Sequence, residues 1–414
     1  MNKIKGTQDF IDLQLFNFII DKARKQCEQY NFSQIATPIL EPTELFKRSL
    51  GTETDVVSKE MYTVDTGPNG DNICLRPEAT ASTIRAFIEN KIQQTPWKVF
   101  SWGAMFRHER PQKGRFRQFH QFNLEVIGSN AISEDALCVK MLDSLFSDSF
   151  GISEYALMIN FLGKPEERRT YVVVLNKYLD TVIDKACKTC VVRKESNILR
   201  VFDCKNETCQ SLYKDAPKIV DNLTESAEEW KQLQEQLDLL SVSYTVDPKL
   251  VRGLDYYSKT VFEFVSPNLG SQNTFCGGGR YNNLVKAIGG KQDQPSIGAS
   301  IGIERLMMVL EPLKDTLALP QPAALTIIIP LSAEQQTLAL LIAQDLHSQQ
   351  LACDVLFEGS VKSMMRKANK MGATYAILIG SEEQENRTAT VKNMVTSSEE
   401  KMDQTKLAQY IKKA

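Results

Sequence analysis

The chain has 414 residues, of which 42% are hydrophobic and 24% are charged. A single core rarely exceeds about 250–300 residues, so we expect two or three domains, and this composition excludes a disordered or fibrous chain. The 49 Lys and Arg residues against 51 Asp and Glu residues give a net charge of −2, so a nucleic-acid partner requires a local basic patch.

Membrane and export signals are not apparent in the sequence. Its apolar stretches fall well short of the ~18–20 residues of a membrane span, and the first residues lack the apolar region of a signal peptide. We therefore expect a cytoplasmic protein with no membrane association. In such a protein, the nine cysteines are expected to be reduced thiols or metal ligands rather than disulfides.

The first 163 residues predict an antiparallel sheet with flanking helices. Apolar side chains at helical spacing predict the first helix, and the prolines in the next extended segment place that strand at an edge. Two longer strands separated by about nine polar residues predict a hairpin. Helices are expected at 12–31 and 79–90, and strands at 33–42, 60–64, 73–76, 97–106 and 116–127.

Residues 164–240 are charged and helical and contain four of the cysteines, so we interpret them as an insertion. Strand-like sequence returns at 260–265, a strand and helix follow over 297–310, and several prolines then mark a linker. From residue 323 strands alternate with helices, which predicts a small α/β domain with a largely parallel core. Its elements are expected at 325–330, 334–349, 352–356, 361–371, 374–379 and 404–413.

Residues 106–117 carry the densest functional signal, with five Arg or Lys residues and one Glu. For an isolated run, a solvated surface loop explains this pattern equally well. On the strand that follows, successive side chains point to opposite faces. One face is mainly apolar, and the other presents Arg117, Phe119, Gln121, Asn123 and Glu125. Because unpaired buried polar groups cost about 1–3 kcal/mol each, the polar face predicts a ligand with positive, negative and flat parts.

The segment 106–121 closely resembles the second signature motif of bacterial histidyl-tRNA synthetases. The first and third motifs of class II synthetases resemble 33–62 and 298–306, and two stretches specific to the histidine enzymes resemble 250–257 and 276–281. The resemblance covers essentially the whole chain.

The resemblance implies a class II catalytic domain, α+β and built on an antiparallel sheet. Its segments would be 1–163 and 241–315, with the helical insertion 164–240 inside it. A linker, 316–322, would lead to a small α/β anticodon-binding domain, 323–414. A homodimer is also expected, because the first motif packs across a two-fold axis in this family.

The implied activity is ligation of L-histidine to tRNA(His). ATP, with Mg²⁺, would form histidyl-adenylate and release pyrophosphate, and the acyl group would then move to the tRNA 3′ end. Negative charge crowds this centre, so cations held in place beforehand stabilise the transition state. Arg107 matches the family's α-phosphate ligand, and Arg252 matches an arginine that contacts carboxylate and α-phosphate where relatives use a metal ion. These two are the expected catalytic residues.

The other site residues are also implied by the resemblance. The adenine would lie between Phe119 and Arg305, with Glu109 near its amino group. Glu125 and Tyr257 would each bond one imidazole nitrogen, and Tyr256 would adjoin them. The expected histidine-binding set is Glu78, Ala79, Thr80, Arg107, Gln121, Glu125, Arg252, Tyr256 and Tyr257, in which Ala79 replaces the family's usual Gly or Met without expected loss. The triple glycine 277–279 is open to two interpretations, a bulge or turn, or a backbone against which the substrate lies.

The tRNA would be met at two places. The loop residues Gln112, Lys113 and Arg117 are implied to contact the acceptor end. In the last domain a basic helix face is a candidate anticodon contact, although a solvated face explains it equally well; its residues are Lys362, Arg366, Lys367 and Lys370.

Four cysteines lie in two pairs, Cys-x2-Cys and Cys-x4-Cys, that are separated by thirteen residues; they are Cys187, Cys190, Cys204 and Cys209. That spacing suits a structural tetrahedral zinc site. Some bacterial family members carry a similar set and many do not, so catalysis does not depend on it. Zinc ligation and four reduced thiols are equally good interpretations.

Two other functions are alternatives. A non-catalytic regulatory paralogue would bind histidine to control another enzyme. Such paralogues typically lack the anticodon-like domain and parts of the motifs, which are present here. A class II synthetase for another amino acid is disfavoured by the stretches 250–257 and 276–281.

Overall fold

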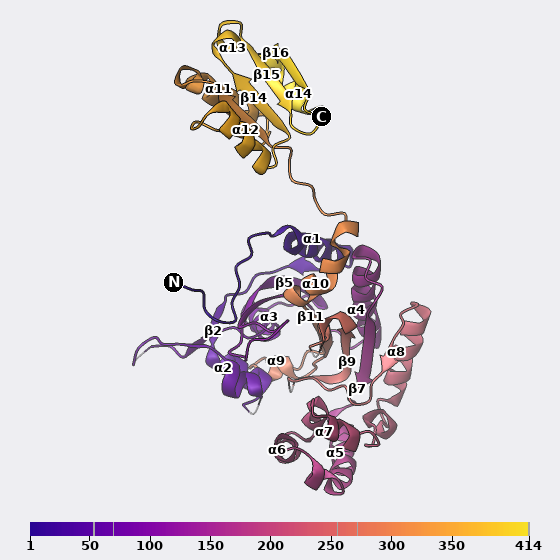
Figure 1. The fold of residues 1–414 in the computed structure, drawn as a ribbon. Coiled ribbons are helices and arrows are strands. Elements are labelled where there is room, and N and C mark those ends of the chain that lie inside the picture. The colour runs from indigo at the N-terminus through magenta and orange to yellow at the C-terminus, as the bar shows by residue number, and fades with distance from the viewer. Residues whose placement is uncertain (53, 69, 255, 271, 413–414) are drawn as a thin grey trace. The chain divides into compact units, whose positions relative to one another are not determined.

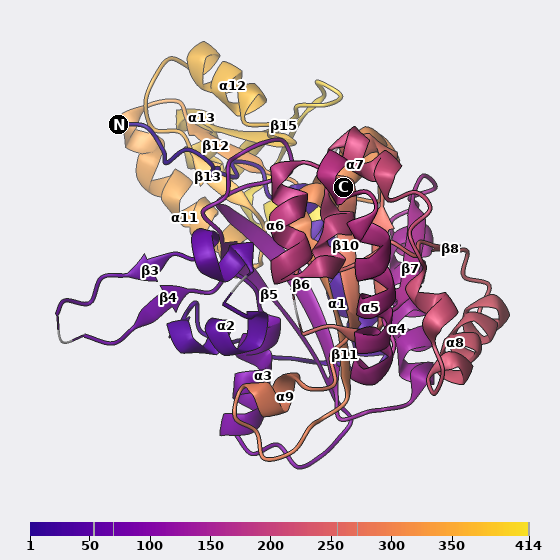
Figure 2. The same ribbon diagram turned by 90° about the horizontal axis from the view of Figure 1, so that it is seen from below.

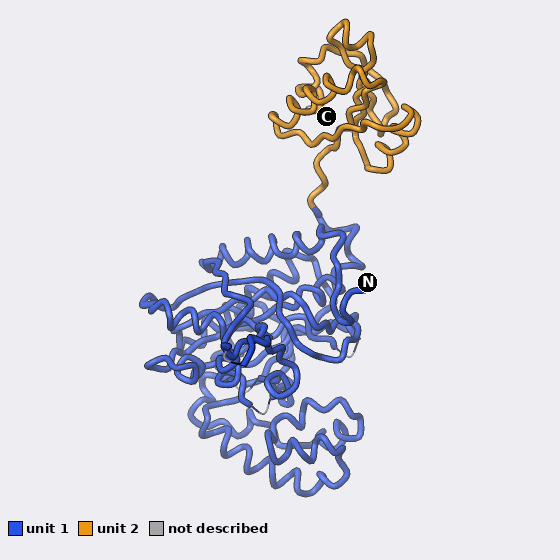
Figure 3. Tube along the Cα trace, turned by 90° about the vertical axis from the view of Figure 1, so that its left-hand side faces the viewer, with its two compact units in different colours: residues 1–319 blue, residues 320–414 orange. Residues whose placement is uncertain are grey.

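The computed structural model describes residues 1–52, 54–68, 70–254, 256–270 and 272–412. It divides into two compact units, Met1–Leu319 and Pro320–Ala414, which Figure 3 colours separately. Each unit contains its own clusters of buried apolar side chains. Across the described residues, every helix is too short or too polar to cross a membrane.

The first unit is built on an eight-stranded sheet (Figure 1). Pairing is antiparallel through its six inner strands, and the short edge strands pair in parallel. The antiparallel sheet expected from the sequence is confirmed. In spatial order the strands are β1 (Ser33–Gln34), β5 (Trp97–Phe106), β6 (Gln118–Ile127), β11 (Ser296–Gly302), β10 (Thr274–Arg280), β9 (Ser258–Val265), β7 (Ala156–Phe161) and β8 (Thr245–Val246).

The expected strand at 33–42 is two strands in different sheets. β1 forms the edge of the large sheet, whereas β2 (Leu40–Pro42) pairs with β4 (Ile73–Leu75), which also pairs with β3 (Thr63–Val64). Pro38 lies between β1 and β2 and cannot donate a ladder hydrogen bond, so the chain leaves one sheet there and enters the other. Figure 2 shows β3 and β4 projecting from the body of the unit.

The apolar face of the large sheet carries the main core. As alternation predicts, Phe122, Leu124 and Val126 of β6 are buried there. They share one cluster with side chains from the covering helices, α1 (Gln14–Gln29), α4 (Ile132–Ser144), α8 (Ala227–Leu239) and α10 (Ile303–Leu310). The opposite face is therefore available for polar chemistry.

The remaining helices of this unit lie beside the sheet and in the insertion. A second cluster joins three helices of the insertion to the loop that carries Tyr257; they are α5 (Pro165–Asp180), α6 (Lys188–Ser196) and α7 (Glu207–Leu212). α8, by contrast, places Leu233 and Leu237 in the main core. The remaining helices of this unit are α2 (Thr43–Leu50), α3 (Thr80–Glu89) and α9 (Leu284–Ala287).

The second unit has a five-stranded mixed sheet. Its order is β13 (Cys353–Val355), β12 (Thr326–Pro330), β14 (Tyr375–Ile379), β15 (Thr388–Asn393) and β16 (Glu399–Asp403). The first three strands are parallel, as expected, and the last two add an antiparallel hairpin that the sequence pattern does not reveal. Its helices are α11 (Gln336–Ser348), α12 (Val361–Lys370), α13 (Ser381–Glu385) and α14 (Leu407–Lys412).

Candidate active site

A cavity of about 950 Å³ opens at the polar face of the large sheet. Its walls come from β6, β9 and β10, the loop around residue 252, and the insertion. It brings together nine predicted site residues from segments far apart in the sequence, namely Glu78, Arg107, Glu109, Phe119, Gln121, Arg252, Tyr256, Tyr257 and Arg305. Asp255, which belongs to the stretch 250–257, lies outside the described residues.

Three further predicted residues, Ala79, Thr80 and Glu125, are buried and are not part of the cavity lining. Glu125 is 2% exposed; its carboxylate accepts hydrogen bonds from Thr80 Oγ1 at 2.7 Å and from the Tyr281 hydroxyl. Burial raises the pKa of Glu125 to about 8, although both hydrogen bonds oppose the shift. Tyr281 had no assigned role, although it ends a stretch typical of the histidine enzymes.

Glycine at position 298 leaves room for the Glu125 side chain. Gly298 of β11 pairs with Glu125 of β6, and a Cβ built on Gly298 would overlap the Glu125 carboxylate. A side chain of any size at this position would therefore displace the carboxylate.

Glu78 is held by the first turn of α3. Its two carboxylate oxygens accept the backbone N–H groups of Thr80 and Ala81, each at 2.8 Å. Free N–H groups at a helix N-terminus favour a carboxylate, whereas burial raises the pKa of Glu78 above its ordinary value. The result is a fixed carboxylate at the cavity wall.

Two arginines enter the cavity from different elements. Arg107, just after β5, donates from Nε to the Pro77 carbonyl at 3.0 Å, and its guanidinium carbon lies 5.4 Å from the centre of the Phe119 ring. Arg252 forms an ion pair with Glu263 and lies 5.6 Å from the Tyr257 ring centre. Both guanidinium groups are therefore oriented by protein contacts.

The predicted adenine-binding residues all line the cavity, and each of them contacts other protein groups there. Arg305, in the first turn of α10, donates to the carbonyls of Gly114 at 2.8 Å and Thr274 at 2.7 Å. Phe119 stacks on Arg107 rather than on Arg305. Glu109 pairs with Arg115 at 2.5 Å.

The loop between β5 and β6 carries the predicted tRNA contacts. Gln112 and Lys113 are exposed at its tip, where Gln112 and Arg115 exchange backbone hydrogen bonds. Arg117 is partly buried and donates from Nε to the Glu109 carbonyl at 3.3 Å. Gly114, Arg115 and Phe116, which lie between Lys113 and Arg117, line the cavity.

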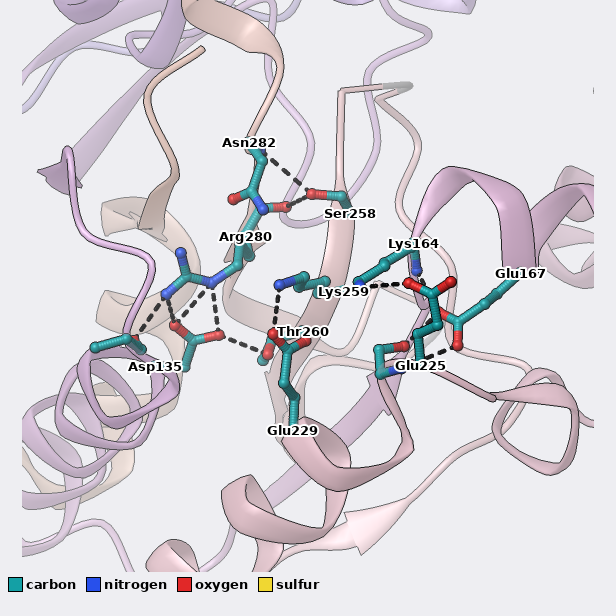
Figure 4. A network of polar contacts seen from close by, with 12 residues as sticks. Asp135, Lys164, Glu167, Glu225, Glu229, Ser258, Lys259, Thr260, Arg280 and Asn282 are labelled. Atoms are coloured by element: carbon teal, nitrogen blue, oxygen red, sulfur yellow. Dashed lines mark hydrogen bonds and ion pairs between the residues drawn. The ribbon is translucent and has the colours of Figure 1, made fainter.

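The triple glycine lies within β10 and does not form a turn; the pairing register shifts after Gly279. Its first member lies under the Arg252 guanidinium, since a Cβ on Gly277 would come within 2.7 Å of Nη1. At the end of β10, Arg280 is fully buried and pairs with Asp135 of α4 (Figure 4). Asp135 also accepts from Thr260 Oγ1 at 2.6 Å, so this network ties α4 to β9 and β10.

The insertion supplies part of the cavity wall, which the sequence did not reveal. Arg193, Arg200 and Lys205 line it. Arg200 Nη2 lies 3.0 Å from Asp55 Oδ2 in the segment after α2, so one ion pair joins the insertion to that segment.

The four cysteines of the insertion converge. Their sulfur atoms all lie within 4.8 Å of one another, and the Cys187 and Cys204 sulfurs are 3.8 Å apart. A hydrogen bond from the Cys190 backbone lowers the pKa of Cys187 to about 7. Tetrahedral zinc with bonds of about 2.3 Å places its sulfur ligands roughly 3.8 Å apart, so the donor set fits that ion.

Comparisons with known proteins agree with this geometry. The family described as Histidyl-tRNA synthetase matches residues 17–306, and the Anticodon binding domain family matches 326–414. The histidine–tRNA ligase of Halothermothrix orenii is 43% identical over 404 residues, covering 95% of each chain. That of Clostridioides difficile is 40% identical over 415 residues, covering 99% of this chain and 98% of its own.

Solved structures give the same result. The apo histidyl-tRNA synthetase of S. aureus matches with a TM-score of 0.81 at 33% identity, over 100% of both chains. A Bacillus halodurans protein described as an ATP phosphoribosyltransferase regulatory subunit/histidyl-tRNA synthetase has a TM-score of 0.64 at 19% identity, over 92% of this chain and 98% of its own. That identity shows a shared fold alone. The chain belongs to the histidyl-tRNA synthetase family.

Proposed function

We propose that this protein is a histidine–tRNA ligase, which forms histidyl-adenylate from L-histidine and ATP and then transfers histidine to the 3′ end of tRNA(His). The observation that carries the proposal is one cavity in which the oriented Arg107 and Arg252 lie beside the buried carboxylates of Glu78 and Glu125. Relatives about 40% identical over nearly the whole chain are ligases. The regulatory alternative draws no support from them.

In the first step, a carboxylate oxygen of histidine attacks the α-phosphorus of ATP. The bond to the bridging oxygen breaks and pyrophosphate leaves with its electrons. Arg107 and Arg252 act as the catalytic residues by holding positive charge against the carboxylate and α-phosphate. Because both are oriented before the reaction, their charge stabilises the transition state without reorganisation.

The amino acid is recognised by the residues around Glu125. Glu125 and Tyr257 bond the imidazole nitrogens, with Tyr256 beside them, and Glu78, Thr80 and Gln121 hold the α-amino group. A buried site of this kind can reject analogues that lack those groups by about 10⁴–10⁵.

ATP occupies the part of the cavity lined by Phe119, Glu109 and Arg305. When bound, Mg²⁺ would neutralise charge on the phosphates of ATP. A planar guanidinium stacks on a ring and also pairs with phosphate, which lysine does poorly.

The tRNA meets both units of the chain. Gln112, Lys113 and Arg117 contact the acceptor end. Residues 323–414 read the anticodon, with a basic face on α12 formed by Lys362, Arg366, Lys367 and Lys370. All four are exposed, whereas Met364 and Ala368 on the same helix are buried, which supports this role. Phosphate contacts make such binding salt-dependent.

We further propose a cytoplasmic homodimer. Exposed apolar side chains around the projecting sheet of β2–β4 and on β5 support a contact with a second copy; they are Ile39, Leu40, Val64 and Trp102. The catalytic domain would consist of 1–163 and 241–315, the insertion of 164–240, and the linker of 316–322.

The cysteine cluster is proposed to hold a structural Zn²⁺, which would crosslink the insertion. Purified protein should then contain about one zinc per chain by elemental analysis, and Cys190→Ser should lose it. Cys353→Ser, in the other unit, is the control that keeps the metal. Wild-type protein prepared with zinc in the medium but containing none would contradict this proposal.

The function is tested by ATP–pyrophosphate exchange with each of the twenty amino acids. We expect exchange with histidine alone. Arg252→Ala should nearly abolish it, and Glu125→Ala should sharply raise the KM for histidine. No exchange, with histidine still bound, would favour the regulatory alternative.

A further inference from the structure

Glu263 is a carboxylate in the cavity that the mechanism above does not use. It lies on β9, lines the cavity, and its side chain is 20% exposed. Across the sheet it pairs with Gly277 of β10.

The contacts of Glu263 are directed at Arg252. One carboxylate oxygen pairs with Arg252 Nη1, and the other accepts from Thr274 Oγ1 at 2.7 Å. The guanidinium lies against Gly277, where a Cβ would come within 2.7 Å of Nη1 and 2.8 Å of Nη2. Among the described residues, Arg252 Nε is buried and has no hydrogen-bond partner. Glu263 thus holds the Arg252 guanidinium through Nη1. Within the described residues, Nε keeps an N–H that no protein group accepts.

Arg252 needs such an anchor because it lies in a loop outside helices and strands. An unrestrained arginine side chain has about 2 kcal/mol of rotamer entropy to lose. Electrostatic stabilisation is effective only when the charge is oriented before the reaction. A carboxylate on a central strand supplies that orientation.

We infer that Glu263 is a positioning residue for adenylate formation, which orients Arg252 toward the substrates without touching them. The inference rests on the proposed function. Thr274 in turn orients Glu263, and Gly277 provides the clearance for the guanidinium.

The test begins with Glu263→Gln, which keeps the size of the side chain and an acceptor for Thr274 but removes the charge. Histidine-dependent pyrophosphate exchange should lose about 10- to 100-fold in kcat, by analogy with residues that orient a catalytic ion. The KM for histidine should stay within about threefold, because the imidazole pocket is unchanged. Glu229→Gln is the matched control, since it removes an ion pair with Lys259 that does not line the cavity, and it should leave kcat unchanged.

A double-mutant cycle separates positioning from general structure. In an Arg252→Ala background, adding Glu263→Gln should change kcat by less than about threefold, because the guanidinium that Glu263 orients is already absent. An equal loss in both backgrounds, or a Glu263→Gln enzyme with wild-type kcat, would overturn the inference.

A readout independent of activity keeps the inference testable if the proposed function fails. In protein labelled with ¹⁵N-arginine, the Nη1–Hη signal of Arg252, the nitrogen that pairs with Glu263, should be resolved in the wild type and is identified by its loss in Arg252→Ala. It should move to the position of a free side chain in Glu263→Gln. An unshifted signal contradicts the positioning role, whereas absence of wild-type exchange contradicts only the proposed function.

Discussion

The carboxyl group of Glu125 combines burial with two hydrogen bonds, from Thr80 and Tyr281. Desolvation outweighs those bonds and raises its pKa from 4.5 to about 8. The folded protein therefore keeps a proton on this group over a range in which the unfolded chain has lost it. Across that range, ionisation of the unfolded chain lowers the free energy of unfolding.

This pKa predicts how Glu125→Gln changes stability with pH. Below pH 4.5 the carboxyl group is protonated in both the folded and the unfolded state, so its ionisation does not lower the free energy of unfolding. Between pH 4.5 and about 8 the wild type loses stability relative to the variant, and above 8 the difference stays constant. The Tm of Glu125→Gln minus that of wild type, measured from pH 5 to 9, should therefore rise until about pH 8 and then level. A difference independent of pH would show that Glu125 is ionised when folded.

At this scale the sequence predicted the residues that alternate along one strand. The alternation of β6 separated Phe119 and Gln121, which line the cavity, from the core side chains. It did not predict the partners Tyr281 and Glu263. Their contacts arise from strand neighbours that are brought together by sheet order, and no local pattern encodes that order.

Arg280 and Asp135 link elements that are 145 residues apart in the chain. Both side chains are 0% exposed, and Arg280 also donates to the carbonyls of Ser129 and Ala131. Breaking such a pair from one side leaves an uncompensated charge in the interior, which costs about 3–5 kcal/mol. The end of β10, and with it Tyr281, depends on this link.

Asp135→Ala should therefore lower the Tm by roughly 4–8 °C for a unit of this size, measured by differential scanning fluorimetry. Glu225→Ala is the control drawn in the same network (Figure 4), because its pair with Lys164 is exposed and exposed pairs contribute little. Equal Tm values for the two variants would mean that Arg280 finds other compensation.

Elements were predicted well where periodicity is strong and poorly where function or charge obscures it. The hairpin of β5 and β6 was expected within two residues of its observed bounds. β16 was missed because four of its five residues are charged, and most of the strand is exposed. The division of 33–42 between two sheets depends on tertiary pairing that the proline pattern alone does not specify.

At the scale of the whole molecule, the boundary near residue 319 separates two units with separate cores. Leu317 and Leu319 pack against the first core, so a chain that ends there keeps its own apolar contacts. The sequence placed the linker at 316–322 from its prolines, and this position stays a prediction.

A chain of residues 1–319 should therefore keep histidine-dependent pyrophosphate exchange within about threefold, because the cavity lies wholly in this unit. Its kcat/KM for charging tRNA should fall roughly 100-fold, since each lost base contact costs about 1–3 kcal/mol. The two assays are run on the same preparation, with full-length protein as reference. Loss of both activities would mean that the first unit needs the second.

Because Gly298 has no side chain, it connects the selection of the amino acid with the binding of the nucleotide. This glycine belongs to the stretch that resembles the third class II motif, yet its clearance is filled by a carboxylate of the amino-acid pocket. A substitution there would first alter which amino acid is accepted, before any effect on nucleotide binding. The third motif and the histidine pocket are therefore expected to evolve together, and neither can drift without a compensating change in the other.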